Sequence, residues 1–415
     1  MYIQRAIESY ILKNYSSSKA LALTGARQVG KTTVTKHLFP NVRRINMKDQ
    51  RLLTASSEDS ALFLDSFGRP LFIDEVQAAP FLLSQIKVIL DDVNSKGNYI
   101  FSGSQKWELM KGLTESLAGM VSVLEMTTLS MRELNHIDFF QPFSLTEAYL
   151  SEREKHLKKY DNLWHFIHNG FYPELYDDSP RAWDDYYRDY VATYIDRDVY
   201  DILKIRDERL FYRFLVSVAA RTGNILNYAN IADDIGADSE TVKSWIGVLE
   251  KTGIIYLLQP YFNSHLNRAI KSPKLYFRDT GLAAYLTNWT TAAQLQNGAM
   301  NGAFYETFVV NEIIKSYINA GKDYSRFLFY YRGKDKRKVS GQESDSEIDL
   351  IIEENNTLYP IEIKKTGNVR SDMAGAFPIL DKDIEKKRGT GAIICRSDYR
   401  LKLRDNLYAL PIEYI

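Results

Sequence analysis

The segment that most constrains the fold of this chain is a glycine-rich stretch, GARQVGKTT, directly after the apolar run Ala20–Thr24. It fits the pattern G-x-x-x-x-G-K-[ST] between an expected strand and an expected helix. There the glycines let backbone N–H groups curl around a phosphate, and the dipole of the helix favours negative charge. We predict that Lys31 reaches the β and γ oxygens of a nucleoside triphosphate and that the Thr32 hydroxyl joins a Mg²⁺ shell. The residues predicted to form this loop are Gly25, Ala26, Arg27, Gln28, Val29, Gly30, Lys31, Thr32 and Thr33.

A second apolar run, Leu71–Ile73, ends in an acidic pair, Asp74 and Glu75. An aspartate at the end of a strand near a phosphate loop can orient Mg²⁺ through its water shell. The glutamate after it is placed to act as the general base that activates the attacking water. Because no N-K-x-D pattern for guanine occurs, the sequence favours ATP with Mg²⁺ over GTP.

A third apolar run, Asn98–Ser102, ends in the sequence SGSQ. A polar side chain at this point would lie between the phosphate loop and the acidic pair, where it could sense the γ-phosphate or position water. Ser104 is the first candidate for this catalytic role and Gln105 the second. The alternative is that these residues only cap a turn.

A fourth apolar run lies at Val121–Glu125. The alternation of these runs with helical patterns predicts an α/β fold for the N-terminal part, a P-loop NTPase core with a parallel sheet and helices on both faces. A helix at 304–318 and strands at 327–331, 347–352 and 359–363 are expected further on, with a charged mobile loop at 333–347. The expected domains are a core at 1–135, a helical lid or linker at 136–225, a winged-helix segment at 226–290 and an α/β domain at 295–415.

The winged-helix prediction depends on a helix-turn-helix pattern that Gly253 closes and a strand follows. The second helix of such a motif can bind DNA in the major groove. Its exposed face is nearly neutral, whereas contact with phosphates needs positive charge. A packing or oligomerisation role is therefore the alternative. The charged residues concerned are Lys243, Lys251, Glu240 and Glu250.

A second candidate site lies in the C-terminal part. Glu362 and Lys364 are two apart on an expected strand, so both face the same side. A hairpin can bring Asp349 beside them, and Glu306 comes from a helix. Three carboxylates can hold Mg²⁺, and the lysine could activate water, as in the D…(D/E)-x-K signature of nucleases. The alternative is a half-exposed hairpin whose charged residues alternate with isoleucines.

Composition adds few constraints on partners. Lys plus Arg and Asp plus Glu both number 53, so the net charge gives no general reason to expect binding to nucleic acid or to a membrane. The single cysteine, Cys395, lies in an apolar run and is expected to be a buried strand residue. No signal core or long apolar run occurs, so a cytoplasmic protein without membrane contact is expected.

Taken together, these motifs resemble a family of prokaryotic AAA+-type ATPases with a C-terminal region of unknown function. The matching stretches are LTGARQVGKTT, LFIDEVQ, FSGSQ, ESLAG, GFYPEL, YIDRDV, SPKLYFRDTGLAAYL, GAFYETFVVNEI, EIDLII and YPIEIKKT. The resemblance implies an AAA+-like core sheet, a winged helix and a restriction-endonuclease-like end domain. It also implies a ring or dimer, and hence a homo-oligomer.

One position departs from the family pattern. In that pattern ESLAG is normally followed by an arginine, a candidate phosphate-contacting or finger residue, but this chain has Met120 there. Arg132 or Arg27 could replace it, a partner subunit could supply the charge, or hydrolysis could be slow, since such an arginine can be worth about 10³–10⁵ in rate.

Three functions are compatible with these patterns. The first is a Mg²⁺-dependent ATPase that couples hydrolysis to a change of conformation or assembly and could act on DNA. The second is an ATP-regulated, Mg²⁺-dependent nuclease. The third is a nucleotide-bound interaction module with little turnover.

Overall fold

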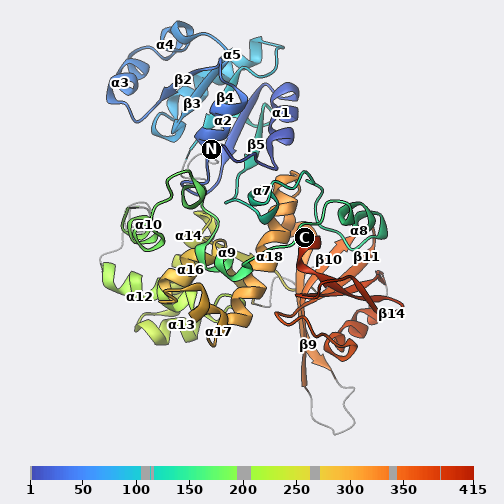
Figure 1. The fold of residues 1–415 in the computed structure, drawn as a ribbon. Helices are drawn as coiled ribbons and strands as arrows, with labels where there is room; N and C mark the ends of the chain where they lie inside the picture. Colours follow the sequence, from blue (N-terminus) through green and yellow to red (C-terminus); the bar gives the residue numbers. More distant parts are fainter. Residues whose placement is uncertain are drawn as a thin grey trace.

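The computed structural model describes residues 2–103, 113, 116–193, 207–261, 272–335, 344–383 and 385–415. Figure 1 shows the N-terminal sheet at the top, a helical region below it, and a second large sheet at the lower right. Helix α18 (Asn301–Asn319) lies between the helical region and this second sheet. Among the described residues, none of the helices combines the length and the apolar character needed to span a bilayer.

The N-terminal sheet has five parallel strands in the order β2-β3-β4-β1-β5. Four of them coincide with the expected apolar runs. The fifth, β2, was not predicted because it is an edge strand in which only Ile45 is buried. The strands are β1 (Ala20–Thr24), β2 (Arg43–Asn46), β3 (Leu71–Asp74), β4 (Tyr99–Ser102) and β5 (Val121–Glu125).

Helices cover both faces of this sheet, as the alternation of side chains along β1 shows. Leu21 and Leu23 belong to a core with residues of α1 and α2, whereas Ala20 and Ala22 pack with residues of α4 and α5. The predicted P-loop fold class is therefore confirmed. The helices are α1 (Glu8–Ser17), α2 (Lys31–Leu38), α3 (Gln50–Glu58), α4 (Ser60–Phe67) and α5 (Phe81–Asp92), with a 3₁₀ turn η1 (Val76–Ala78).

The next region is helical, as expected from its sequence. Its last part has the chain order α12, β6, α13, α14, β7, β8, and the three strands form an antiparallel sheet in the order β6-β8-β7. A winged helix has this order of elements. Residues 262–271, between β7 and β8, lie outside the described ones, so the winged helix stays a prediction. The elements are α7 (Met131–Leu134), α8 (Glu147–Glu154), α9 (Leu163–Asn169), η2 (Pro173–Tyr176), α10 (Trp183–Tyr190), α12 (Glu208–Ala219), β6 (Asn224–Ile225), α13 (Tyr228–Ile235), α14 (Ser239–Lys251), β7 (Ile255–Leu258) and β8 (Lys274–Phe277).

The C-terminal part forms a mixed sheet in the order β14-β15-β13-β11-β10-β9, with β12 beside β11. Cys395 is buried in β13, as expected. Helices α16 (Thr280–Leu286) and α17 (Ala292–Asn297) lie in the helical region, where they contact α9. The elements of the C-terminal part are η4 (Tyr324–Arg326), β9 (Leu328–Asp335), β10 (Ser344–Glu354), β11 (Thr357–Ile363), η5 (Ser371–Ala374), η6 (Phe377–Lys382), β12 (Lys387–Arg388), β13 (Gly391–Cys395), β14 (Leu401–Arg404), β15 (Leu407–Pro411) and η7 (Ile412–Tyr414).

The prediction of a charged loop over 333–347 was wrong at both ends, where the residues belong to strands. Strands β9 and β10 pair up to Asp335 and Ser344, so both ends of that segment belong to a hairpin. Charge alone does not prevent a strand when its neighbour satisfies the backbone N–H and C=O groups. The remaining residues of this loop, 336–343, lie outside the described ones. The turn expected between β10 and β11 is present, with positive φ at Asn355 and Asn356.

Helix α18 connects the C-terminal part to the N-terminal core. The buried Lys315 ammonium donates to the carbonyl of Leu129 at 2.7 Å and pairs with Glu312 at 2.9 Å. The other oxygen of Glu312 accepts from the N–H of Met131 at 2.7 Å. Because all these groups are buried and have partners, the segment that follows β5 is fixed against α18.

A second buried ion pair holds the N-terminus next to the phosphate loop. Arg5 Nε lies 3.0 Å from Glu133 Oε1, with 4% and 0% of the two side chains exposed. The guanidinium also donates to the carbonyls of Val29 and Thr127, at 2.7 Å each. Thus one side chain joins the segment before α1, the phosphate loop and the segment after β5.

We predict that Glu133→Ala lowers the free energy of unfolding by about 3–5 kcal/mol, because it leaves the Arg5 guanidinium buried without its counter-charge. Urea denaturation followed by circular dichroism measures this change. Glu152→Ala is the control, since Glu152 pairs with Lys155 on the surface with 44% and 66% of the side chains exposed. It should cost less than about 1 kcal/mol. Equal losses in the two variants would contradict the assignment.

Candidate functional site

The turn between β1 and α2 is shaped by backbone angles that few residues adopt. Gly25 and Gly30 have φ of +129° and +93°, and Gln28 between them has φ of +61°. A Cβ on Gly25 would lie 2.2 Å from the carbonyl oxygen of Met126, so only glycine fits there. Helix α2 then begins at Lys31, which leaves its first backbone N–H groups at the open end of the turn.

Lys31 points back into this turn. Its ammonium donates to the carbonyl oxygens of Gly25 at 2.9 Å and of Ala26 at 2.7 Å. Burial lowers the pKa of the ammonium to about 8, against the opposing effect of the negative charges of Glu75 and Asp74. The lysine is thus a buried cation whose present partners are neutral carbonyls.

The acidic pair lies at the same edge of the sheet, because the strands are parallel. Strand β4 separates β3 from β1, and its last residue, Ser102, donates its hydroxyl to Asp74 Oδ1. That same oxygen accepts from the backbone N–H of Glu75 at 3.1 Å. The Glu75 carboxylate is held by Gln77 Nε2 at 2.5 Å and Lys48 Nζ at 3.2 Å.

Ser102 was not among the candidates that the sequence suggested. The predicted Ser104 and Gln105 lie outside the described residues, and the described contact with Asp74 comes from the residue two positions earlier. The pattern FSGSQ contains both serines, so only the register of β4 against β3 distinguishes them.

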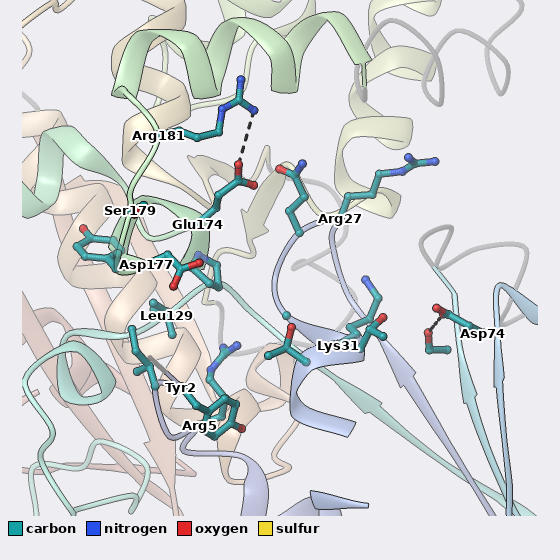
Figure 2. Close-up of a pocket in the computed structure, with 18 of the residues that line it drawn as sticks. Tyr2, Arg5, Arg27, Lys31, Asp74, Leu129, Glu174, Asp177, Ser179 and Arg181 are labelled. Atoms are coloured by element: carbon teal, nitrogen blue, oxygen red, sulfur yellow. Dashed lines mark hydrogen bonds and ion pairs between the residues drawn. The ribbon is translucent and has the colours of Figure 1, made fainter. Parts of the chain in front are cut away.

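These residues line one cavity of about 780 Å³ (Figure 2). Lys31 and Asp74 lie on one side, Tyr2 and Arg5 lie below, and residues of the helical region lie opposite. The cavity therefore lies between the N-terminal sheet and the segment from η2 to α10. Its lining comprises Tyr2, Ile3, Arg5, Arg27, Gln28, Gly30, Lys31, Thr32, Thr33, Asp74, Glu75, Ser102, Leu129, Pro173, Glu174, Tyr176, Asp177, Ser179, Arg181 and Thr193.

The helical region contacts the phosphate loop directly. Tyr186, buried on α10, donates its hydroxyl to Gln28 Oε1 at 2.7 Å. Near the end of β8, Arg278 pairs with Glu125, the last residue of β5, at 2.6 Å. A shift of the loop or of the end of β5 therefore has a physical route to α10 and to the three-stranded sheet.

The arginine missing at Met120 does not bear on the cavity of the same chain. The carbonyl of Met120 accepts from the N–H of Ala20, at the start of β1. The phosphate loop follows the other end of β1, about 13 Å away at the usual rise of a strand. Arg132 does not replace it, because its guanidinium is buried and donates to Phe139, Gln141 and Tyr149. Arg27 does line the cavity.

The exposed charges of the helix-turn-helix region give no support to DNA binding. On α14 the exposed ionic residues are two lysines and two glutamates, and the preceding exposed residues, such as Asp233 and Asp238, are acidic. Contact with phosphates needs an excess of positive charge, which these described residues do not provide.

The four residues of the predicted nuclease pattern do come together. Asp349 lies on β10 and Glu362 on β11, and Lys364 directly follows β11. Lys364 Nζ is 2.5 Å from Glu362 Oε1. Burial raises the pKa of Glu362 to about 8 and, with the charge of Asp349, that of Glu306 to about 7. Among the described residues, however, no group of three or more acidic, histidine or cysteine side chains is arranged to hold a metal ion.

Comparisons with known proteins agree with this architecture. Residues 17–135 match the family model of an AAA domain. Residues 160–293 and 301–415 match two domains of unknown function, DUF8612 and DUF4143. Uncharacterized proteins of Mycobacterium tuberculosis and Mycobacterium bovis are both 24% identical over 397 residues, which cover 95% of this chain and 80% of theirs.

Among solved structures, the chain is similar to the Walker-type ATPase of Pyrococcus abyssi, at 16% identity and a TM-score of 0.39, over 69% of this chain and 96% of that one. A STAND protein of Pyrococcus horikoshii with a tetratricopeptide repeat sensor matches at 14% identity and a TM-score of 0.27, over 77% of this chain and 48% of that one.

The fold and the cavity define a P-loop NTPase core joined to a mixed-sheet domain. More specifically, the chain combines an AAA+-type P-loop ATPase domain with a C-terminal DUF4143 domain of unknown function. The resemblance inferred from the sequence is thereby confirmed. The winged-helix and restriction-endonuclease-like assignments stay predictions.

We predict that Gly25→Ala destabilises the chain by about 1–3 kcal/mol, because the turn needs a positive φ and the new Cβ would displace Met126. Thermal denaturation measures the loss. Gly247→Ala is the control, since that glycine is in the middle of α14 with open space around it. It should be stabilising by about 0.5–1 kcal/mol. A melting temperature unchanged by Gly25→Ala would argue against this geometry.

Proposed function

We propose that the chain binds ATP with Mg²⁺ in the cavity between the N-terminal sheet and the helical region, and that it hydrolyses the ATP. The observation that carries this proposal is the meeting of Lys31, Thr32, Asp74 and Glu75 in one cavity at the carboxyl edge of the sheet. Loop amides, a cation, a hydroxyl and two carboxylates are the groups that a magnesium triphosphate requires.

Lys31 is proposed as the main phosphate-binding cation. The anionic oxygens of a triphosphate would replace the Gly25 and Ala26 carbonyls as partners of the Lys31 ammonium. This exchange is favourable because hydrogen bonds between ions are stronger than those to neutral groups. The backbone N–H groups from Gln28 to Thr33 would bind the same phosphates at the start of α2. The exchange of partners by Lys31 would release two carbonyls of the loop.

Thr32 and Asp74 fit a Mg²⁺ ion, since both offer oxygen atoms at the cavity and Mg²⁺ prefers such ligands. The hydroxyl of Ser102 and the N–H of Glu75 fix Asp74 in its present orientation. When bound, the metal ion would neutralise charge on the phosphates. Glu75 is proposed to accept the proton of the attacking water, and its contacts with Lys48 and Gln77 would hold its carboxylate for that role.

The contacts of the loop suggest how hydrolysis could act on the rest of the chain. Gln28 belongs to the phosphate loop and accepts from Tyr186 on α10. We propose that binding and release of the triphosphate move α10 through this hydrogen bond, which would couple turnover to a change of conformation in the helical region.

For the catalytic role of Glu75, we predict that Glu75→Gln lowers the turnover number by about 10²–10⁴, the usual contribution of a general base. Binding of ATP should change little, because the amide keeps the size of the side chain. Phosphate release and fluorescent-nucleotide binding measure the two effects. Glu58→Gln on the exposed face of α3 is the matched control and should retain full activity. Turnover that survives in Glu75→Gln would refute the assignment.

For Lys31, we predict proton uptake on binding at high pH. Its pKa is about 8 in the free chain, and the phosphates would raise it. The lysine is therefore already charged at pH 7, whereas at pH 9 it must gain close to one proton, so affinity falls as pH rises above 8. Calorimetry of MgATP binding in two buffers of different ionisation enthalpy counts these protons. Equal heats in both buffers at pH 9 would contradict the prediction.

A further inference from the structure

The acidic cluster of the C-terminal sheet contains a cation of the chain itself. Lys274, the first residue of β8, has only 3% of its side chain exposed. Its ammonium lies 2.7 Å from Glu306 Oε1, 2.6 Å from Glu347 Oε1 and 3.6 Å from Asp349 Oδ1. An ammonium has three donors and no acceptor. Two carboxylates lie within hydrogen-bond distance of it, and the third lies at ion-pair distance.

Two of these carboxylates make further hydrogen bonds. Glu306 Oε1 accepts from the Tyr276 hydroxyl at 2.7 Å. Asp349 Oδ2 accepts from the N–H of Ile363 at 2.8 Å. These contacts fix Glu306 and Asp349 around the ammonium, and Glu362 is bound to Lys364.

A divalent ion does not fit among these residues as they stand. The nuclease pattern requires the oxygens of Glu306, Asp349 and Glu362 to turn toward one metal ion, which binds them at about 2.0–2.6 Å. Here the ammonium lies against two of these carboxylates. A divalent ion in the same place would meet a buried like charge, which is strongly unfavourable at such short distance.

We propose that Lys274 takes the place of the metal ion in this cluster, so that the C-terminal domain holds an internal ammonium instead of a catalytic divalent cation. The lysine belongs to the sheet β6-β8-β7, whereas Glu347 and Asp349 belong to β10. The ion pairs therefore clamp the helix-turn-helix region onto the C-terminal sheet. Displacement or loss of Lys274 would open a carboxylate site for a divalent ion.

This inference is independent of the ATP site and has its own test. Mn²⁺ binding to the full chain without nucleotide is followed by electron paramagnetic resonance, which counts free Mn²⁺. Wild type and Asp349→Asn should bind the same number of ions. Lys274→Met should bind one more Mn²⁺ per chain, and Lys274→Met with Asp349→Asn should lose that ion again.

Lys315→Met is the matched control, because Lys315 is equally buried but has Glu312 as its carboxylate partner. It should gain no Mn²⁺. A wild-type chain that binds a Mn²⁺ ion which Asp349→Asn removes would overturn the proposal, and so would a folded Lys274→Met variant without the extra ion. If Lys274→Met does not fold, the comparison of wild type with Asp349→Asn decides: equal binding supports the internal ammonium, and unequal binding refutes it.

Discussion

The turn from β1 into α2 is the constraint on which the rest of the site depends. Positive φ at Gly25, Gln28 and Gly30 bends the chain within a few residues, and the close approach of Gly25 to Met126 fixes the turn against the end of β5. The other walls of the cavity face or contact this turn. Asp74 and Glu75 face it because parallel strands end at one edge, and Tyr186 contacts it from the opposite wall.

Buried lysines connect the parts of the chain. Lys315 joins α18 to the segment after β5, and Lys274 joins β8 to the C-terminal sheet. Lys31, by contrast, contacts carbonyls of its own loop. A buried ammonium is costly without partners. If the joined elements separated, the ammonium groups of Lys315 and Lys274 would lose partners. The relative position of these elements therefore depends on a few charges.

The P-loop part of the fold could be predicted from sequence because its signals are local. Nine consecutive residues, which include Gly25, Gly30 and Lys31, are enough to predict the turn, and the apolar runs predict four of the five strands. The edge strand β2 escaped because it buries only one apolar side chain. The contact of Ser102 with Asp74 depends on the register of β4 against β3, which no local pattern contains.

The acidic cluster of the C-terminal sheet shows more clearly which contacts cannot be predicted from the sequence. Glu306, Asp349, Glu362 and Lys364 were recognised from a pattern within one domain. Lys274 lies 32 residues before Glu306 in sequence, in a strand of another sheet. Its position follows from the packing of α18 against β8, and a long-range contact of this kind leaves no periodic signal. Likewise, only the pairing of β5 with β1 places Met120 at the end of β1 that is away from the phosphate loop.

A structure of the full chain with Mg²⁺ and a non-hydrolysable ATP analogue tests the central claim most directly. We expect the β-phosphate against the backbone N–H groups between Gln28 and Thr33, and Lys31 Nζ moved from the Gly25 and Ala26 carbonyls to the phosphate oxygens. A nucleotide bound elsewhere, or a Lys31 that keeps both carbonyls with the nucleotide present, would contradict the account.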